Sequence, residues 1–140
     1  MKLFIDTNII LDLLQYREPW INDTLVLFQL AKEDKVELIM SDLTFVNVVY
    51  IAGKNVDKKA LKETLVKLKK FVKVVSIGDA CIEQALNGDF FDFEDEVQYF
   101  AAKREQADYI LSRDESGFKV SDIPVMNVTE FLDVFIGKHV

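Results

Sequence analysis

Short apolar runs that stop on polar residues alternate along this chain with stretches whose apolar residues recur at helical spacing. The first run, Lys2–Ile5, stops at Asp6, and the apolar positions then take a period near 3.6 residues. Such runs predict strands at 2–5, 36–40, 73–76, 109–111 and 124–127. Helical spacing predicts helices at about 8–16, from Pro19 onward, between Ser41 and Gly53, and at 58–71, 79–86, 92–106 and 129–135.

Strands that alternate with helices predict right-handed crossover connections and a parallel sheet with helices on both faces. We therefore expect an α/β protein, a three-layer α/β/α sandwich with a mainly parallel sheet of four to five strands. The length of 140 residues is typical of one domain, and neither a linker nor an internal repeat interrupts the pattern. A single domain over residues 1–140 is the simplest organisation.

Composition narrows the setting in which the protein works. Half of the residues are apolar and 29% are charged, as in ordinary globular proteins. No apolar run reaches the roughly 18 residues that would span a bilayer, so we expect no membrane segment. The start of the chain lacks the pattern of a signal peptide, and Cys81 is the only cysteine. These features favour a cytoplasmic protein.

The net charge of −7 is unevenly distributed. The segment from Lys54 to Lys73 carries eight lysines against two acids, whereas Asp79 to Glu96 carries seven acids and no lysine or arginine. Such a distribution of charge is evidence about binding partners, but for the lysines taken alone a solvated helix face is the favoured explanation.

Two carboxylates stand where predicted strands end. Asp6 follows the first strand, and Asp114 closely follows the strand at 109–111. In open α/β sheets, ligands collect at the carboxyl ends of strands, and Mg²⁺ and Mn²⁺ prefer oxygen ligands of this kind. Asp95 joins them if its helix begins near the same edge of the sheet. The sequence thus predicts a metal site built from three acids.

Each acid also has a structural explanation. Asp6 has the right position to cap the helix that follows it. Asp92 and Asp95 have the spacing of a helix-capping pair, and Asp114 lies in a polar loop suited to a turn. The case for a metal site therefore depends on all three acids occurring together.

The chain resembles PIN domains, the nuclease fold that includes the VapC-like toxins of bacterial and archaeal toxin–antitoxin systems. The resemblance covers nearly the whole chain and is carried by Phe4–Asp12, by Asp92–Asp95 with its helix, and by Ala107–Asp114. It implies that Asp6, Asp95 and Asp114 bind the metal, that Asn8 and Ser112 orient these acids or their bound waters, and that Asp92 supports them. It also implies an antitoxin partner and a homodimer.

Position 47 departs from the pattern of that family. PIN domains generally carry a glutamate six residues after a serine like Ser41, and this chain has Asn47 there. An amide can ligate or orient a metal-bound water, but it brings no charge and cannot act as a base. We therefore expect weaker metal binding than with four acids.

The resemblance and the carboxylates favour a Mg²⁺- or Mn²⁺-dependent endoribonuclease, with Asp6, Asp95, Asp114 and Asn47 in the active site. We expect Lys54, Lys58, Lys59 and Lys62 to hold the flanking phosphates of the RNA. Asn47 favours the main alternative, a catalytically weak module that binds RNA or a partner protein without cleavage. A phosphatase that uses Asp6 as its nucleophile fits less well, because that chemistry usually needs a second acid where Asn8 stands.

Overall fold

The computed structural model describes residues 1–118 and 121–139. Its described part contains a parallel sheet of five strands in the order β3-β2-β1-β4-β5. The strands are β1 (Lys2–Ile5), β2 (Glu37–Ser41), β3 (Val72–Val75), β4 (Tyr109–Leu111) and β5 (Val125–Met126). The predicted sandwich with a parallel sheet is therefore confirmed.

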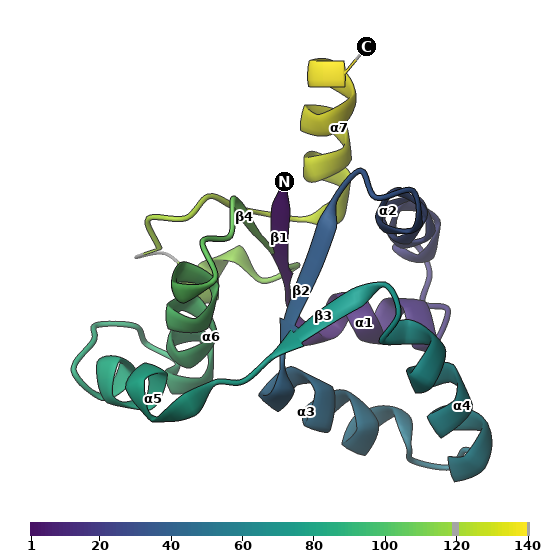
Figure 1. The fold of residues 1–140 in the computed structure, drawn as a ribbon, viewed down its shortest axis with the longest axis horizontal. Helices are drawn as coiled ribbons and strands as arrows, with labels where there is room; N and C mark the ends of the chain where they lie inside the picture. Colours follow the sequence, from purple (N-terminus) through teal and green to yellow (C-terminus); the bar gives the residue numbers. More distant parts are fainter. Residues whose placement is uncertain (119–120, 140) are drawn as a thin grey trace.

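Seven α-helices and one short 3-10 helix (Glu115–Phe118) accompany the sheet in the described residues. The α-helices are α1 (Thr7–Leu14), α2 (Ile21–Lys32), α3 (Asp42–Ala52), α4 (Lys58–Leu68), α5 (Gly78–Leu86), α6 (Phe93–Arg104) and α7 (Val128–His139). Figure 1 shows α5 and α6 on one side of the sheet and α2 and α4 on the other.

The two faces of the sheet have separate apolar cores because side chains alternate along each strand. In β1, Leu3 and Ile5 pack with α1, α2, α4 and α7, whereas Phe4 packs with α5 and α6. In β2, Leu38 and Ile39 divide between the two cores in the same way. Burial on both faces explains why these strands appear in the sequence as continuous apolar runs.

The winding of the sheet reverses between β1 and β4. From β1 the chain proceeds outward to β2 and β3, and it then returns to β4 on the other side of β1. Doubly wound sheets bind ligands just beyond the strand ends at such a switch point. Asp6 and Ser112 follow the paired residues Ile5 and Leu111 and so lie at this switch point.

Several helix boundaries differ from the sequence-based prediction; α7, for example, begins at Val128 and runs to His139 and not from 129 to 135. Pro19 was expected in the first turn of a helix, but α2 begins at Ile21, after a turn closed by the Ile21 N–H donating to the carbonyl of Arg17. Helix α4 was expected to continue to residue 71, but it ends at Leu68, and β3 already begins at Val72. The errors at α2 and α4 arise where a turn takes over the backbone hydrogen bonds of a helix end.

Within the described residues, none of the helices has the length and apolar character needed to cross a membrane.

Candidate metal centre

Asp6 lies at the carboxyl end of β1 and caps α1. Its Oδ1 accepts a hydrogen bond from the Thr7 backbone N–H at 2.7 Å, and its Oδ2 accepts one from the Ser112 hydroxyl at 2.9 Å. Burial raises the pKa of Asp6, and these two hydrogen bonds oppose the rise because they stabilise the charged form. The capping role considered from the sequence is confirmed, and it leaves the carboxylate facing the end of β4.

Ser112 connects Asp6 to the loop that carries Asp114. It is fully buried at the end of β4, and its Oγ accepts a hydrogen bond from the Asp114 backbone N–H at 3.1 Å. Asp114 itself accepts a short hydrogen bond from the Ser116 hydroxyl. Ser112 thus donates a hydrogen bond to the carboxylate of Asp6 and accepts one from the backbone N–H of Asp114.

Asp95 comes to the same place from α6. Asp92 caps this helix, since its Oδ1 accepts a hydrogen bond from the Asp95 backbone N–H at 3.0 Å. The predicted capping pair is therefore confirmed. The loop after β4 packs closely against Asp95: a Cβ atom added to Gly117 would lie 2.2 Å from its Oδ2. Glycine at this position leaves room for the carboxylate, and a larger residue would require the Asp95 side chain to shift.

The charges of the three acids act on one another. The pKa of Asp95 is raised to about 7, first by burial and then by the negative charges of Asp92, Asp6, Asp114 and Glu94. Asp114 also raises the pKa of Asp6. The structure therefore brings Asp6, Asp95 and Asp114 into one electrostatically coupled cluster, while their role as metal ligands stays a prediction.

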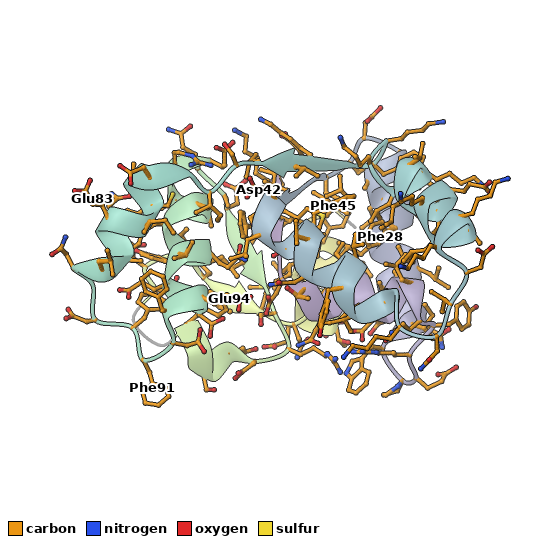
Figure 2. The ribbon with its side chains drawn as sticks, turned by 90° about the horizontal axis from the view of Figure 1, so that it is seen from below. Phe28, Asp42, Phe45, Glu83, Phe91 and Glu94 are labelled. Carbon is orange, nitrogen blue, oxygen red and sulfur yellow. The ribbon has the colours of Figure 1, made fainter. Side chains whose placement is uncertain are left out.

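Asn47 has a partner that the sequence did not reveal. Its Nδ2 donates a hydrogen bond of 3.0 Å to Oε1 of Glu94, in the first turn of α6. Figure 2 shows Glu94 between α6 and α3. Burial raises the pKa of Glu94, the charges of Asp92 and Asp6 raise it further, and the bond from Asn47 lowers it. The one feature of the sequence that hinted at this contact is Glu94 itself, an additional acid directly before Asp95.

The acids suit a divalent cation in their chemistry and charge, but they do not form a closed cage. Among residues 1–118 and 121–139, no group of three or more His, Cys, Asp or Glu side chains is arranged so that it could hold a metal ion. Mg²⁺ commonly takes only one or two carboxylates and keeps several waters. The carboxylates are thus compatible in chemical type with an open, hydrated site, and metal binding by them stays a prediction.

The other predicted site residues are Asn8 and four lysines. Asn8 is half-buried in the first turn of α1, and its supporting role stays a prediction. Lys54 lies over the ring of Tyr50, 4.9 Å from its centroid, just beyond the end of α3. The other predicted RNA-binding lysines are Lys58, Lys59 and Lys62, all on α4. Figure 1 shows α4 and α6 on opposite sides of the molecule, so these lysines flank the acids at a distance.

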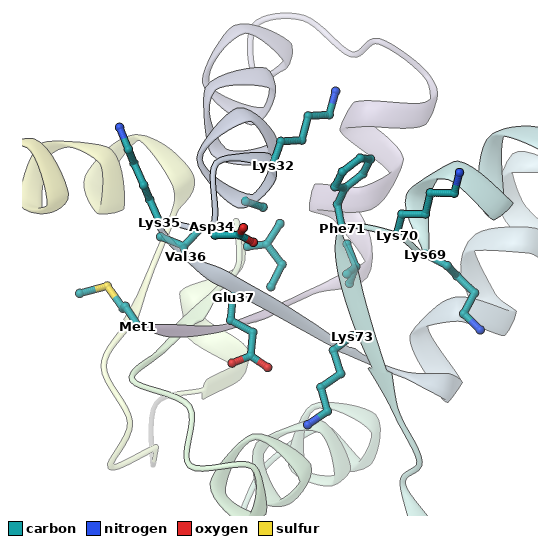
Figure 3. Close-up of a pocket in the computed structure, with 13 residues that line it drawn as sticks. Met1, Lys32, Asp34, Lys35, Val36, Glu37, Lys69, Lys70, Phe71 and Lys73 are labelled. Atoms are coloured by element: carbon teal, nitrogen blue, oxygen red, sulfur yellow. The ribbon is translucent and has the colours of Figure 1, made fainter.

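A hollow of about 860 Å³ opens at the opposite, amino edge of the sheet (Figure 3). Its lining includes five lysines, Lys32, Lys35, Lys69, Lys70 and Lys73. Their ammonium groups point in different directions in Figure 3, and two of them pair with Glu33 and Glu105 at 3.6 and 3.7 Å. These lysines do not converge on a common ligand position.

Arg113 lies between Ser112 and Asp114 and contacts the buried Asp12 and the partly exposed Trp20. Its guanidinium carbon is 3.7 Å from the ring centroid of Trp20, and its Nη2 is 3.4 Å from Oδ1 of Asp12. Asp12 is only 1% exposed, and burial raises its pKa while Arg113 and Arg17 oppose the rise. This anchor holds the exit of β4 beside Asp6. Sequence patterns did not reveal this anchor, because Arg113 lies far along the chain from Asp12 and Trp20.

Comparison with known proteins shows which family this chain resembles. The chain matches the PIN domain family over residues 2–116. It is 31% identical to "Ribonuclease VapC1" of Aquifex aeolicus over 137 residues, which cover 94% of each chain. Two similar solved structures are FitAcB from Neisseria gonorrhoeae and a toxin–antitoxin complex from Klebsiella pneumoniae. The former has a TM-score of 0.68 at 16% identity and covers 91% of this chain and 98% of the other. The latter has a TM-score of 0.66 at 18% identity, with 90% and 97% covered.

The raised pKa of Asp95 predicts a pH-dependent effect of removing its charge. The folded pKa of about 7 lies above the ordinary value of 3.8, so its contribution to stability is fully present below pH 3.8. That contribution is lost as the pH rises through 7. In the metal-free protein, Asp95→Asn should therefore raise the unfolding midpoint at pH 8 much more than at pH 5. Urea unfolding with a chelator measures this difference.

The matched control is Asp89→Asn, which changes an exposed acid just before α6. Its effect on the midpoint should be small and nearly equal at both pH values. An Asp95→Asn effect that is the same at pH 5 and pH 8 would show that burial and the neighbouring charges do not raise the pKa of Asp95 as described.

Proposed function

The chain belongs to the PIN-domain family, and we propose that the protein is a metal-dependent endoribonuclease that acts as the toxin of a toxin–antitoxin pair. The observation that carries this proposal is the clustering of Asp6, Asp95 and Asp114 at the switch point of the sheet. The likeness to a relative named as a ribonuclease supports the type of reaction.

Asp6, Asp95 and Asp114 would hold Mg²⁺ or Mn²⁺. When bound, the ion supplies charge stabilisation at the scissile phosphate and an activated water for hydrolysis of the phosphodiester. The Ser112 hydroxyl and the Thr7 N–H fix both oxygens of Asp6, so that this carboxylate enters the site already oriented. Without a cation, the cluster would repel RNA, so the acids couple RNA binding to metal binding.

Cleavage of RNA should require both the metal and the acids. With a mixed-sequence RNA, activity should appear with Mg²⁺ or Mn²⁺ and disappear with a chelator. Asp6→Asn and Asp95→Asn should each reduce the rate by about 100-fold or more, because each change removes a charged ligand. Asp133→Asn, which changes an exposed acid of α7, should leave the rate unchanged.

The alternative is a module that binds RNA without cutting it, and the neutral Asn47 is the feature that favours it. RNA binding without metal-dependent cleavage in the purified protein would support that alternative and contradict the nuclease. Cleavage that survives Asp6→Asn would show that another site or a contaminant acts.

We assign Lys54, Lys58, Lys59 and Lys62 to the RNA backbone outside the cleft. Because α4 lies away from α6, these lysines act on binding and not on the chemical step. Replacing Lys58, Lys59 and Lys62 with Ala should raise KM, leave kcat unchanged, and reduce the slope of log affinity against log salt by about 2. Replacing Lys35, Lys69 and Lys70, which border the amino-edge hollow, is the matched control. Equal effects of the two triple variants would mean that only net charge matters.

An apolar groove between α1, α2 and α4 suits an antitoxin segment. It has a volume of about 470 Å³, its lining includes Leu13, Tyr16 and Leu25, and Lys32 and Lys67 also border it. Apolar residues flanked by cations favour an amphipathic partner segment with acidic neighbours. The solved toxin–antitoxin complex of similar fold supports a partner of this class.

We also propose a homodimer, and the fully exposed Phe91 at the turn before α6 supports it (Figure 2).

The groove can be tested by co-expressing this chain with a candidate antitoxin, for which a small protein encoded beside it would be the first choice. Leu25→Asp should abolish co-purification of the two proteins, because it places a charge in the apolar groove. Val66→Asp, on the exposed side of α4, is the control and should have no effect. Binding that withstands Leu25→Asp but not Val66→Asp would move the partner to the outer face of α4.

A further inference from the structure

A cavity beside the acids at the carboxyl edge of the sheet has no part in the proposed metal chemistry. Its volume of about 400 Å³ is within the range of about 300–1,000 Å³ that is typical of small-molecule sites. Its lining includes Arg113, which lies between Ser112 and Asp114 in the chain, and Asn127, which directly follows β5. Because β4 and β5 are parallel neighbours, this cavity lies at the same strand ends as the acids.

Trp20 and Arg113 form a cation–π pair on the wall of this cavity. The guanidinium carbon of Arg113 is 3.7 Å from the ring centroid of Trp20, and Trp20 is 41% exposed. The Trp20 carbonyl accepts hydrogen bonds from the backbone N–H and the hydroxyl of the buried Thr24 at 3.1 and 3.0 Å, which fix its backbone at the start of α2. Aromatic rings and guanidinium planes are the surfaces on which proteins stack unpaired RNA bases.

The charges around the cavity suit a neutral ring better than a phosphate. Asp12 and Asp23 both line it, and together they outweigh the single positive charge of Arg113. Carboxylates repel the oxygens of a phosphate, whereas they accept hydrogen bonds from the N–H groups of a base. A nucleobase is therefore the part of an RNA chain that fits here.

Two buried polar atoms beside the cavity lack a hydrogen-bond partner. Asp12 and Arg113 attract each other across 3.4 Å, but in the part of the chain that the structure describes neither Oδ1 of Asp12 nor Nε of Arg113 makes a hydrogen bond. Such atoms are uncommon in folded proteins, and they indicate that a further polar group completes the site.

Asp23 supplies hydrogen-bond acceptors to this cavity. It is half-buried in the first turn of α2, and its Oδ2 accepts a hydrogen bond from the Thr129 hydroxyl of α7. An ionised carboxylate only accepts hydrogen bonds. Guanine is the RNA base that presents two adjacent donors to a carboxylate, at its N1 and at its N2 amino group. The acid therefore favours guanine over the other three bases.

We propose that this cavity binds one unpaired base of the RNA substrate, beside the phosphate that is cleaved. The base lies against Trp20 and Arg113, and Asp23 makes guanine the preferred base. This inference rests on the proposed ribonuclease function. It adds a source of sequence selectivity that phosphate contacts from the lysines cannot supply.

The fluorescence of Trp20 tests this site directly, because Trp20 is the only tryptophan of the chain. With a chelator present, guanosine monophosphate (GMP) should quench this fluorescence saturably and at lower concentration than the adenosine, cytidine and uridine monophosphates. Asp23→Asn should weaken GMP binding by roughly 10-fold. Asp79→Asn changes an exposed acid in the first turn of α5 and should bind GMP like the unmodified protein. N-acetyltryptophanamide, titrated in parallel, corrects for light absorbed by the nucleotides.

The Asp6→Asn variant separates this proposal from the proposed function, because it should lose RNA cleavage and still be quenched by GMP. Cleavage by the unmodified protein without quenching by any nucleotide would leave the proposed function standing and overturn the base site. Quenching without cleavage would support the base site and contradict the nuclease. Equal quenching by all four nucleotides would overturn the role of Asp23. Quenching by a candidate antitoxin but by no nucleotide would assign the cavity to a protein partner and overturn the proposal. Circular dichroism of each variant shows whether it is folded.

Discussion

Carboxylates gathered beyond the carboxyl end of β1 repel one another, and this repulsion constrains the residues around them. Burial and then the charges of neighbouring acids raise the pKa values of Asp6, Glu94 and Asp95. Such a cluster opposes folding unless hydrogen bonds, protons or a cation offset it. The Ser112 hydroxyl, the Thr7 N–H and the Asn47 amide each donate to one of these carboxylates.

The sheet determines where this cluster can form. Since β1 and β4 are parallel neighbours, the chain leaves both at the same edge, and the winding reverses between them. The residues after Ile5 and Leu111 are therefore adjacent although they are far apart in the sequence. Helix α6 adds Asp95 because Asp92 begins it near this edge, and Gly117 leaves space for that carboxylate. The opposite edge, formed by the amino ends of the strands, carries the lysine-lined hollow.

Much of this arrangement could be predicted from the sequence. Buried parallel strands produce apolar runs, and the run that ends at Asp6 located both a strand and an acid at its exit. The capping role of Asp92 was predictable because helix capping depends on residues close in sequence. The start of α2 was not, since the turn around Pro19 competes with the helix for the same residues. The family relationship suggested by the motifs is confirmed by the match over residues 2–116 and by the 31% identical relative.

Contacts between distant segments were harder to predict. The contact of Asn47 with Glu94 depends on how α3 and α6 rotate against each other, and Thr44 and Gln98 set that rotation in the core. The association of Arg113 with Asp12 and Trp20 likewise needs three separate segments to meet. Sequence patterns describe one element at a time, so the acids could be named individually but their partners could not.

The account depends most directly on where a divalent ion binds. Crystals grown with Mn²⁺ and measured at a wavelength with a strong manganese anomalous signal would locate it. The account predicts an anomalous peak with Asp6 and at least one of Asp95 and Asp114 at about 2.0–2.2 Å. Saturating Mn²⁺ that gives no peak beside Asp6, or a peak elsewhere in the molecule only, would contradict it.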